Sequence, residues 1–174
     1  MKTIIGLTLL LSLSSNAQQS ENLLKLGSEF PNFELEELNG SKLSSSSLTG
    51  KVVFINLWFT SCVPCIEKMP ELNKLAEAYK DKVEFLSITF DDVEKVETFL
   101  KSRDFGFRHL VNASGFLKNE LQNKSYPRNI IITRKGEIAL VNDGLPFTRD
   151  EVTGEMKPLP YTYFGKSLDK ALSE

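Results

Sequence analysis

A run of nine residues from Lys51 to Phe59 constrains the fold of this chain most strongly, because seven of the nine are aliphatic or aromatic. A nearly continuous apolar run of this length is typical of a strand that is covered on both faces of an α/β sheet. From Pro64 to Tyr79 the apolar residues recur at helical spacing instead. Pro64 suits the first turn of that helix, whereas Pro70 lies inside it and is expected to kink it. The chain is therefore predicted to pass from a buried strand directly into a helix.

The rest of the chain alternates strand and helix patterns, which predicts a central sheet flanked by helices. Asp91 and Glu94 form an acidic capping box that is expected to open the second helix. Asn39-Gly40 and the Gly136 turn are expected to close two hairpins. The segment 143–160, with three prolines, is predicted to be a loop. The expected elements are a hairpin over 30–43, a helical turn near Leu48, a strand over 83–90, a helix over 93–100, a strand over 108–111, a short helix over 116–121, a hairpin over 129–142 and a last helix over 164–172.

Composition limits the classes of protein to which the chain can belong. Its 174 residues, 41% of them hydrophobic, suit one globular domain. The formal charge of -2 gives no basic excess of the kind that nucleic-acid binding requires. Two cysteines exclude a scaffold with several disulfides, and the single histidine excludes a site that needs two imidazoles.

The first 17 residues have the layout of a secretory signal peptide. A positive start at Lys2 precedes an apolar stretch over 4–13, and small residues at Ser15 and Ala17 suit a cleavage before Gln18. An uncleaved anchor or a strand of the fold are the alternatives for this stretch. We expect a signal peptide over 1–17, a flexible lead-in over 18–28 and one domain over 29–174, in an extracytoplasmic compartment such as the periplasm, where disulfides persist.

Both cysteines fall in one motif, Cys62-Val63-Pro64-Cys65, at the junction between the strand and the helix. The amide groups and dipole at a helix N-terminus favour the thiolate form of the first sulfur. Cys62 is therefore predicted to be an exposed nucleophile that attacks a partner disulfide, and Cys65 the thiol that resolves the mixed disulfide. Two alternatives remain. A metal site would need carboxylates as further ligands, and a purely structural disulfide would close a loop too short to restrain the unfolded chain much.

The stretch Trp58 to Cys65, followed by Pro70, resembles the TlpA/ResA-like branch of the thioredoxin superfamily, within the AhpC/TSA-redoxin-like proteins. The resemblance extends from about Phe30 to Asn142. It implies a thioredoxin-like fold: a central mixed sheet flanked by helices, with an extra N-terminal hairpin and a helix–strand insertion over 91–111.

The resemblance also implies roles for other residues. Pro127 matches a cis proline that lies opposite the cysteines, and Tyr126 would offer its backbone to an extended substrate. Trp58 would pack beneath the active site, with Pro64, Glu67 and Lys68 as supporting residues.

The chain departs from the family at the positions that transfer protons. Asn56 stands where thioredoxin has a buried acid, and Lys68 stands where ResA-like members often have a glutamate. The acid here is Glu67, whose neighbouring position on a helix favours a solvent-facing side chain. The proton-transfer residue is therefore unassigned. His109 is predicted to be a packed or surface residue rather than a catalytic one.

The resemblance implies an exported thiol-disulfide oxidoreductase that reduces disulfides of extracytoplasmic proteins through a Cys62–Cys65 cycle. Its partners would be disulfide or dithiol proteins and a membrane electron donor, with apocytochrome c as one target; no nucleic acid is expected. The cysteine pair would be the redox group, without metal, flavin or nucleotide. The alternatives are a thiol peroxidase, which usually has Thr where Phe59 stands, and a non-catalytic peptide- or metal-binding chaperone.

Overall fold

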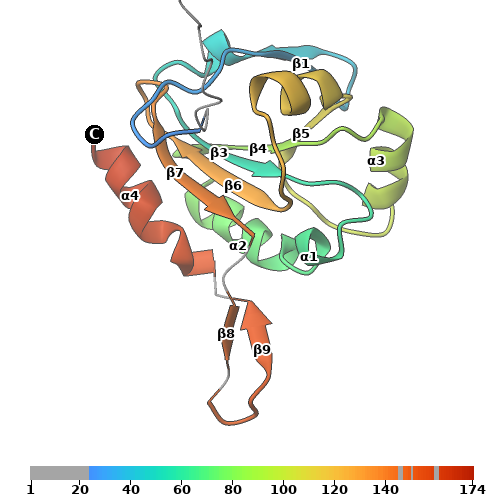
Figure 1. The fold of residues 1–174 in the computed structure, drawn as a ribbon, viewed down its shortest axis with the longest axis vertical. Helices are drawn as coiled ribbons and strands as arrows, with labels where there is room; N and C mark the ends of the chain where they lie inside the picture. Colours follow the sequence, from blue (N-terminus) through green and yellow to red (C-terminus); the bar gives the residue numbers. More distant parts are fainter. Residues whose placement is uncertain (1–23, 145–146, 150, 159–160) are drawn as a thin grey trace, which may run out of the picture.

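Seven strands form one mixed sheet in the order β2-β1-β5-β4-β3-β6-β7 (Figure 1). The computed structural model describes residues 24–144, 147–149, 151–158 and 161–174. The strands of the sheet are β1 (Glu34–Glu37), β2 (Lys42–Ser44), β3 (Val52–Leu57), β4 (Val83–Ile88), β5 (Arg108–Val111), β6 (Arg128–Ile132) and β7 (Ile138–Asp143). The helices are η1 (Ser45–Leu48), α1 (Val63–Ile66), α2 (Met69–Tyr79), α3 (Val93–Leu100), the π-helix η2 (Phe116–Glu120), η3 (Tyr161–Tyr163) and α4 (Gly165–Ser173). No helix in the described ranges is long and apolar enough to cross a membrane.

The strand predicted from the apolar run, β3, lies inside the sheet, and all six of its residues are buried. It pairs in parallel with β4 and antiparallel with β6, and β4 pairs in parallel with β5. The carboxyl ends of β3, β4 and β5 therefore meet at one edge of the sheet, which is the usual place for a binding site in α/β proteins.

Two hydrophobic clusters cover the two faces of the sheet. One includes buried residues from α2, α3 and α4, such as Leu75, Val96 and Leu168. The other includes Phe33 of the N-terminal segment and Phe116 of η2, whose rings lie 5.5 Å apart. Figure 1 shows α1 and α2 on the side of the sheet opposite η2. The predicted sheet with flanking helices is confirmed.

The helix predicted over 64–79 is interrupted rather than kinked. It ends as α1 at Ile66 and resumes as α2 at Met69, with Pro70 in the first turn of α2. Pro70 has no amide hydrogen, and its ring would clash with the carbonyl of Ile66 in a continuous helix. The helix therefore restarts at the proline.

The loop predicted over 143–160 is wrong for seven of its described residues: Asp143 ends β7, and six others form two further strands. The strands β8 (Phe147–Arg149) and β9 (Met156–Pro158) pair antiparallel, and this hairpin projects away from the main sheet (Figure 1). Pro158 misled the prediction, because proline is tolerated at the end of an edge strand where no ladder hydrogen bond is lost.

The N-terminal predictions lie mostly outside the described residues. The expected signal peptide over 1–17 does so entirely, and only 24–28 of the expected lead-in are described. Leu24 is buried in the core, and Gly27 N donates to Ile138 O at 2.8 Å. In this part the chain is held against β7 rather than extending freely, because an apolar side chain is buried and backbone hydrogen bonds are made.

His109 is a packed residue of β5, as predicted. Its Nε2 lies 3.0 Å from the carbonyl oxygen of Phe105, and its Nδ1 lies 2.6 Å from Ser87 Oγ. A carbonyl can only accept, so Nε2–H donates and Nδ1 accepts from the Ser87 hydroxyl, which describes a neutral imidazole. Burial lowers the pKa of His109 to about 4.

This lowered pKa makes folding stability depend on pH. The contribution is fully present above pH 6.5, the ordinary pKa, and is lost as the pH falls toward about 4, because only the unfolded chain then takes up the proton. We expect the free energy of unfolding to fall by up to about 3 kcal/mol over this window. In His109→Gln the fall should be smaller. Urea titrations at several pH values measure the free energy of unfolding. An equal fall with pH in the wild type and His109→Gln would show that His109 is not responsible.

Candidate redox site

Cys62 and Cys65 form a disulfide at the start of α1, with their Cα atoms 5.2 Å apart. Cys62 is the N-cap residue of α1, and its Sγ accepts a hydrogen bond from Cys65 N at 3.3 Å. Pro64 lies in the first turn, as predicted, where its missing N–H costs no hydrogen bond. An amide of the helix start therefore points at the first sulfur, an arrangement that favours the thiolate once the disulfide is reduced.

Both sulfur-bearing residues are largely covered in this disulfide form. Cys62 is 4% exposed and Cys65 2% exposed, whereas Val63 between them is 63% exposed. The prediction of an exposed Cys62 is wrong for this state, because both cysteines pack into the same cluster as Trp58 and Met69. The surface of the motif is therefore apolar.

Three aromatic side chains from separate segments meet beside the cysteines. Phe59 stacks on Phe90 with ring centroids 5.3 Å apart, and Tyr126 meets the two rings edge-on at 5.3 and 5.8 Å. We call Phe59, Phe90 and Tyr126 the aromatic trio. The carbonyl of Phe59 accepts from Cys62 N at 3.0 Å, so the trio adjoins the disulfide.

Tyr126 of the trio directly precedes Pro127, the residue for which the family resemblance implied a cis peptide bond. The Tyr126–Pro127 peptide bond is cis, as expected, and Pro127 is buried at the start of β6. Sequence reasoning missed Phe59 and Phe90. The signal was present, since both are the last residues of strands predicted to be buried, and the carboxyl ends of such strands share one sheet edge.

Asp91 holds the loop in front of the cysteines instead of capping a helix. Its Oδ2 accepts from Thr60 N at 2.6 Å. The N-cap of α3 is Asp92, whose carboxylate accepts from Lys95 N at 2.9 Å. The capping prediction was wrong by one residue, because two adjacent aspartates fit the pattern and only the tertiary contact with Thr60 distinguishes them.

Trp58 is fully buried in the cluster that contains the cysteines, and it contacts Phe99 and Phe105 with ring centroids 5.1 and 5.4 Å apart. Asn56 is also buried and donates through Nδ2 to Asn129 Oδ1 at 2.8 Å. An amide pair thus occupies the place where thioredoxin has a buried acid, and an amide does not take up or release a proton in this pH range.

Glu67 is exposed, whereas Lys68 is only 1% exposed. Lys68 lies in the turn that follows Cys65, whose carbonyl accepts from Lys68 N at 3.2 Å. Its Nζ lies 3.9 Å from the ring centroid of Phe147, a cation–π contact with β8. Burial lowers the pKa of Lys68, while the carboxylates of Glu67 and Glu71 act in the opposite direction.

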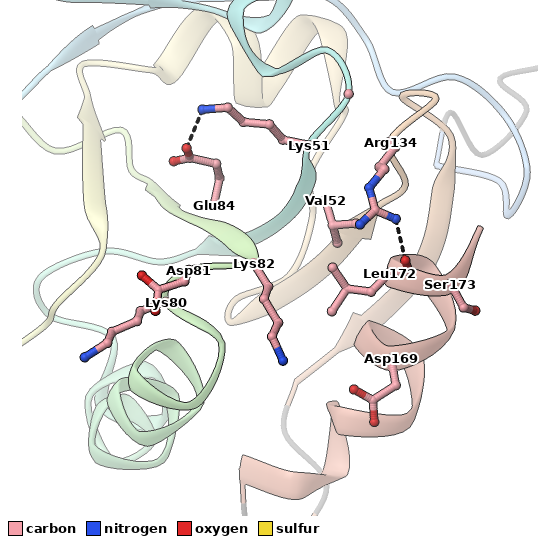
Figure 2. Close-up of a pocket in the computed structure, with 11 residues that line it drawn as sticks. Lys51, Val52, Lys80, Asp81, Lys82, Glu84, Arg134, Asp169, Leu172 and Ser173 are labelled. Atoms are coloured by element: carbon pink, nitrogen blue, oxygen red, sulfur yellow. Dashed lines mark hydrogen bonds and ion pairs between the residues drawn. The ribbon is translucent and has the colours of Figure 1, made fainter.

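A wide cleft of about 800 Å³ lies away from the cysteines, at the opposite end of the sheet. Figure 2 shows Lys82 and Asp169 on its two sides. Lys51 donates a hydrogen bond to Glu84, and Arg134 donates one to the carbonyl of Leu172. Several residues that line the cleft lie at the starts of β3 and β4, whereas Cys62 follows the end of β3. It plays no part in the redox site.

In the part of the chain that the structure describes, no three His, Cys, Asp or Glu side chains are grouped so that they could hold a metal ion. That the cysteine pair works without a metal or organic cofactor stays a prediction.

A thioredoxin-like sheet that presents a Cys-x-x-Cys disulfide at a helix start, with a cis proline beside it, defines a thiol-disulfide oxidoreductase. The comparisons with known proteins agree with this class. The sequence model of the Redoxin family matches residues 25–150, and the chain belongs to this family, as a TlpA/ResA-like member of the thioredoxin superfamily.

Two curated relatives are similar to most of the chain. Thioredoxin-like protein YneN of Bacillus subtilis is 34% identical over 122 residues, which cover 68% of this chain and 71% of that protein. Thiol-disulfide oxidoreductase ResA of Bacillus thuringiensis is 32% identical over 120 residues, which cover 68% of this chain and 69% of that protein.

Solved structures show the same fold. A putative thiol:disulfide interchange protein DsbE from Chlorobium tepidum superposes with a TM-score of 0.72 at 22% identity, covering 86% of this chain and 99% of that one. A putative thioredoxin from Neisseria meningitidis has a TM-score of 0.66 at 28% identity, covering 84% of this chain and 92% of that one. The predicted thioredoxin-like fold is confirmed.

The buried position of Lys68 leads to a prediction about Cys62. Lys68→Met keeps an apolar stem against Phe147 but removes a positive charge from the turn after Cys65. We expect alkylation of Cys62 in the reduced protein at about pH 7 to slow about threefold, because the thiolate loses electrostatic support. Lys80→Met is the control, since Lys80 is exposed and paired with Glu77. Equal alkylation rates in the wild type and Lys68→Met would contradict the role of Lys68.

Proposed function

We propose that this protein is an exported reductase of protein disulfides that cycles between a Cys62–Cys65 dithiol and disulfide. The observation that carries the proposal is the hydrogen bond from Cys65 N to Cys62 Sγ at the start of α1. A structural disulfide does not need this position, whereas a nucleophilic thiolate is stabilised by it. Two similar proteins, a thiol-disulfide oxidoreductase and a putative thiol:disulfide interchange protein, support the same activity.

The proposed reaction is two successive thiol–disulfide exchanges. The Cys62 thiolate attacks one sulfur of the substrate disulfide, the substrate S–S bond breaks, and the leaving thiolate takes a proton from water. Cys65 loses its proton to water and, as thiolate, attacks Cys62 Sγ; the S–S bond between Cys62 and the substrate breaks, and the departing substrate thiolate takes a proton from water. The substrate gains two electrons and two protons, and the protein is left as the Cys62–Cys65 disulfide.

The surroundings of the cysteines suit an extended polypeptide as substrate. Val63 and Phe90 are exposed apolar side chains beside the covered sulfurs, and the backbone of Tyr126 lies just before β6, at the cis bond. An extended segment could add to that backbone as a short strand.

A second dithiol protein must reduce the Cys62–Cys65 disulfide after each cycle. For an exported protein this donor would be a membrane protein that carries electrons from the cytoplasm, and apocytochrome c cysteines are one candidate target. The residues between the cysteines, Val63-Pro64, include no histidine, whereas the strong oxidant DsbA has one there. The absence of this histidine favours a reductase over an oxidase.

The cysteine variants test this function. Cys62→Ser should abolish reduction of insulin disulfides by the mature protein with dithiothreitol as electron source, because the nucleophile is lost. Cys65→Ser should instead accumulate a mixed disulfide with the substrate, visible by mass spectrometry. The reduction potential, measured against glutathione and dithiothreitol buffers, should lie near that of thioredoxin, about −270 mV.

Three results would contradict the proposal. A potential near that of DsbA, about −120 mV, would indicate an oxidase. Peroxide consumption that survives Cys65→Ser would indicate a peroxidase. Insulin reduction no faster than with dithiothreitol alone would favour a binding protein.

Export has its own test. When the full chain is produced in a bacterium, the protein recovered from the extracytoplasmic fraction should begin at Gln18, because the small residues at Ser15 and Ala17 suit signal peptidase. N-terminal sequencing measures this. Recovery of the chain in the cytoplasm with Met1 intact would contradict it.

A further inference from the structure

A groove of about 400 Å³ lies directly beside the aromatic trio and is not lined by the cysteines. Two trio members, Phe90 and Tyr126, form part of its wall. Leu117, Lys118 and Lys124 also line it, from η2 and the segment that leads to β6. We call it the lysine groove.

The lysine groove combines an apolar wall with positive charge. Phe90 is 42% exposed and Tyr126 is half-buried, so these two rings offer apolar surface to a ligand. Lys118 and Lys124 are exposed, and no acidic residue lines the groove. Among the described residues neither lysine forms a salt bridge with a carboxylate, which is also true of Lys82 and Lys135. The groove therefore carries two uncompensated positive charges.

The groove and the redox site form one continuous surface. Phe59 is hydrogen-bonded through its carbonyl to Cys62 N at 3.0 Å, and its ring lies 5.3 Å from both Phe90 and Tyr126. An extended polypeptide advances roughly 3.3 Å per residue. A substrate whose cysteine meets Cys62 and whose chain passes the trio would therefore reach the groove within roughly two to four residues.

We propose that the lysine groove binds an acidic side chain of the target polypeptide, two to four residues from the cysteine that Cys62 attacks. The carboxylate lies between the ammonium groups of Lys118 and Lys124, and the adjoining apolar atoms pack on Phe90 and Tyr126. This inference rests on the proposed function and names the substrate class of the same site. The groove selects the substrate and adds no chemical step.

Paired peptides test this inference. Two synthetic disulfide-linked peptides would differ only in Glu or Gln three residues from the cysteine, and kcat/KM for their reduction would be measured with dithiothreitol as electron source. We expect the wild type to favour the Glu peptide about fivefold, the size of effect that two exposed ion pairs give. The difference should lie mainly in KM, because the interaction is present before the exchange begins. It should shrink in about 0.5 M salt.

The double variant Lys118→Gln/Lys124→Gln should abolish the preference for the Glu peptide, so that kcat/KM is about the same for both peptides. Lys82→Gln/Lys135→Gln is the matched control, since it removes the same charge from two exposed lysines that do not line the groove. The control should keep the fivefold preference. This comparison separates a local contact from the net charge of the protein.

The outcomes separate the two proposals. Equal reduction of both peptides by the wild type, or a preference that the groove variant retains, would overturn the groove and leave the reductase intact. A preference that the control loses as well would also overturn it, by showing a net-charge effect. No reduction of either peptide would overturn the proposed function, and this inference with it.

Discussion

The burial of β3 between β4 and β6 is the constraint on which the rest of the structure depends. All six residues of β3 are buried, and its backbone is paired on both sides. The strand therefore cannot shift in register without exposing its apolar side chains. The residues that follow β3 directly, including Phe59, Thr60 and Cys62, therefore have fixed positions at the carboxyl edge of the sheet.

At that edge the cysteine loop is held by contacts that come from other strands. Asp91, after β4, accepts from Thr60 N, and Tyr126, before β6, packs on Phe59. These contacts place a helix start, a cis proline and an apolar rim around one disulfide. Preorganisation of this kind lets an exchange reaction proceed without first ordering the loop.

The electrostatics of the site differ from what its family pattern implies. Lys68 occupies the position where ResA-like members often have an acid, and it is almost completely buried against Phe147 of the β8–β9 hairpin. With Asn56 in place of a buried acid, the site has a cation and an amide where carboxylates are usual. A cation favours thiolates but cannot accept a proton from one. Neither group can act as the proton acceptor that the family pattern implies, and the proton-transfer residue stays unassigned.

The sequence by itself determined the central strand, the helix start at the cysteines and the hairpins at Asn39-Gly40 and Gly136. These features depend on local hydrophobic period, turn residues and capping, which act over a few neighbouring positions. Family resemblance added the cis bond at Pro127. Tertiary structure alone decided which aspartate caps α3, that Lys68 is buried, and that Phe59, Phe90 and Tyr126 meet. The β8–β9 hairpin likewise could not be read from a proline-rich segment. Each of these depends on residues far apart in the chain, and no local pattern records which of them the packing of the sheet brings together.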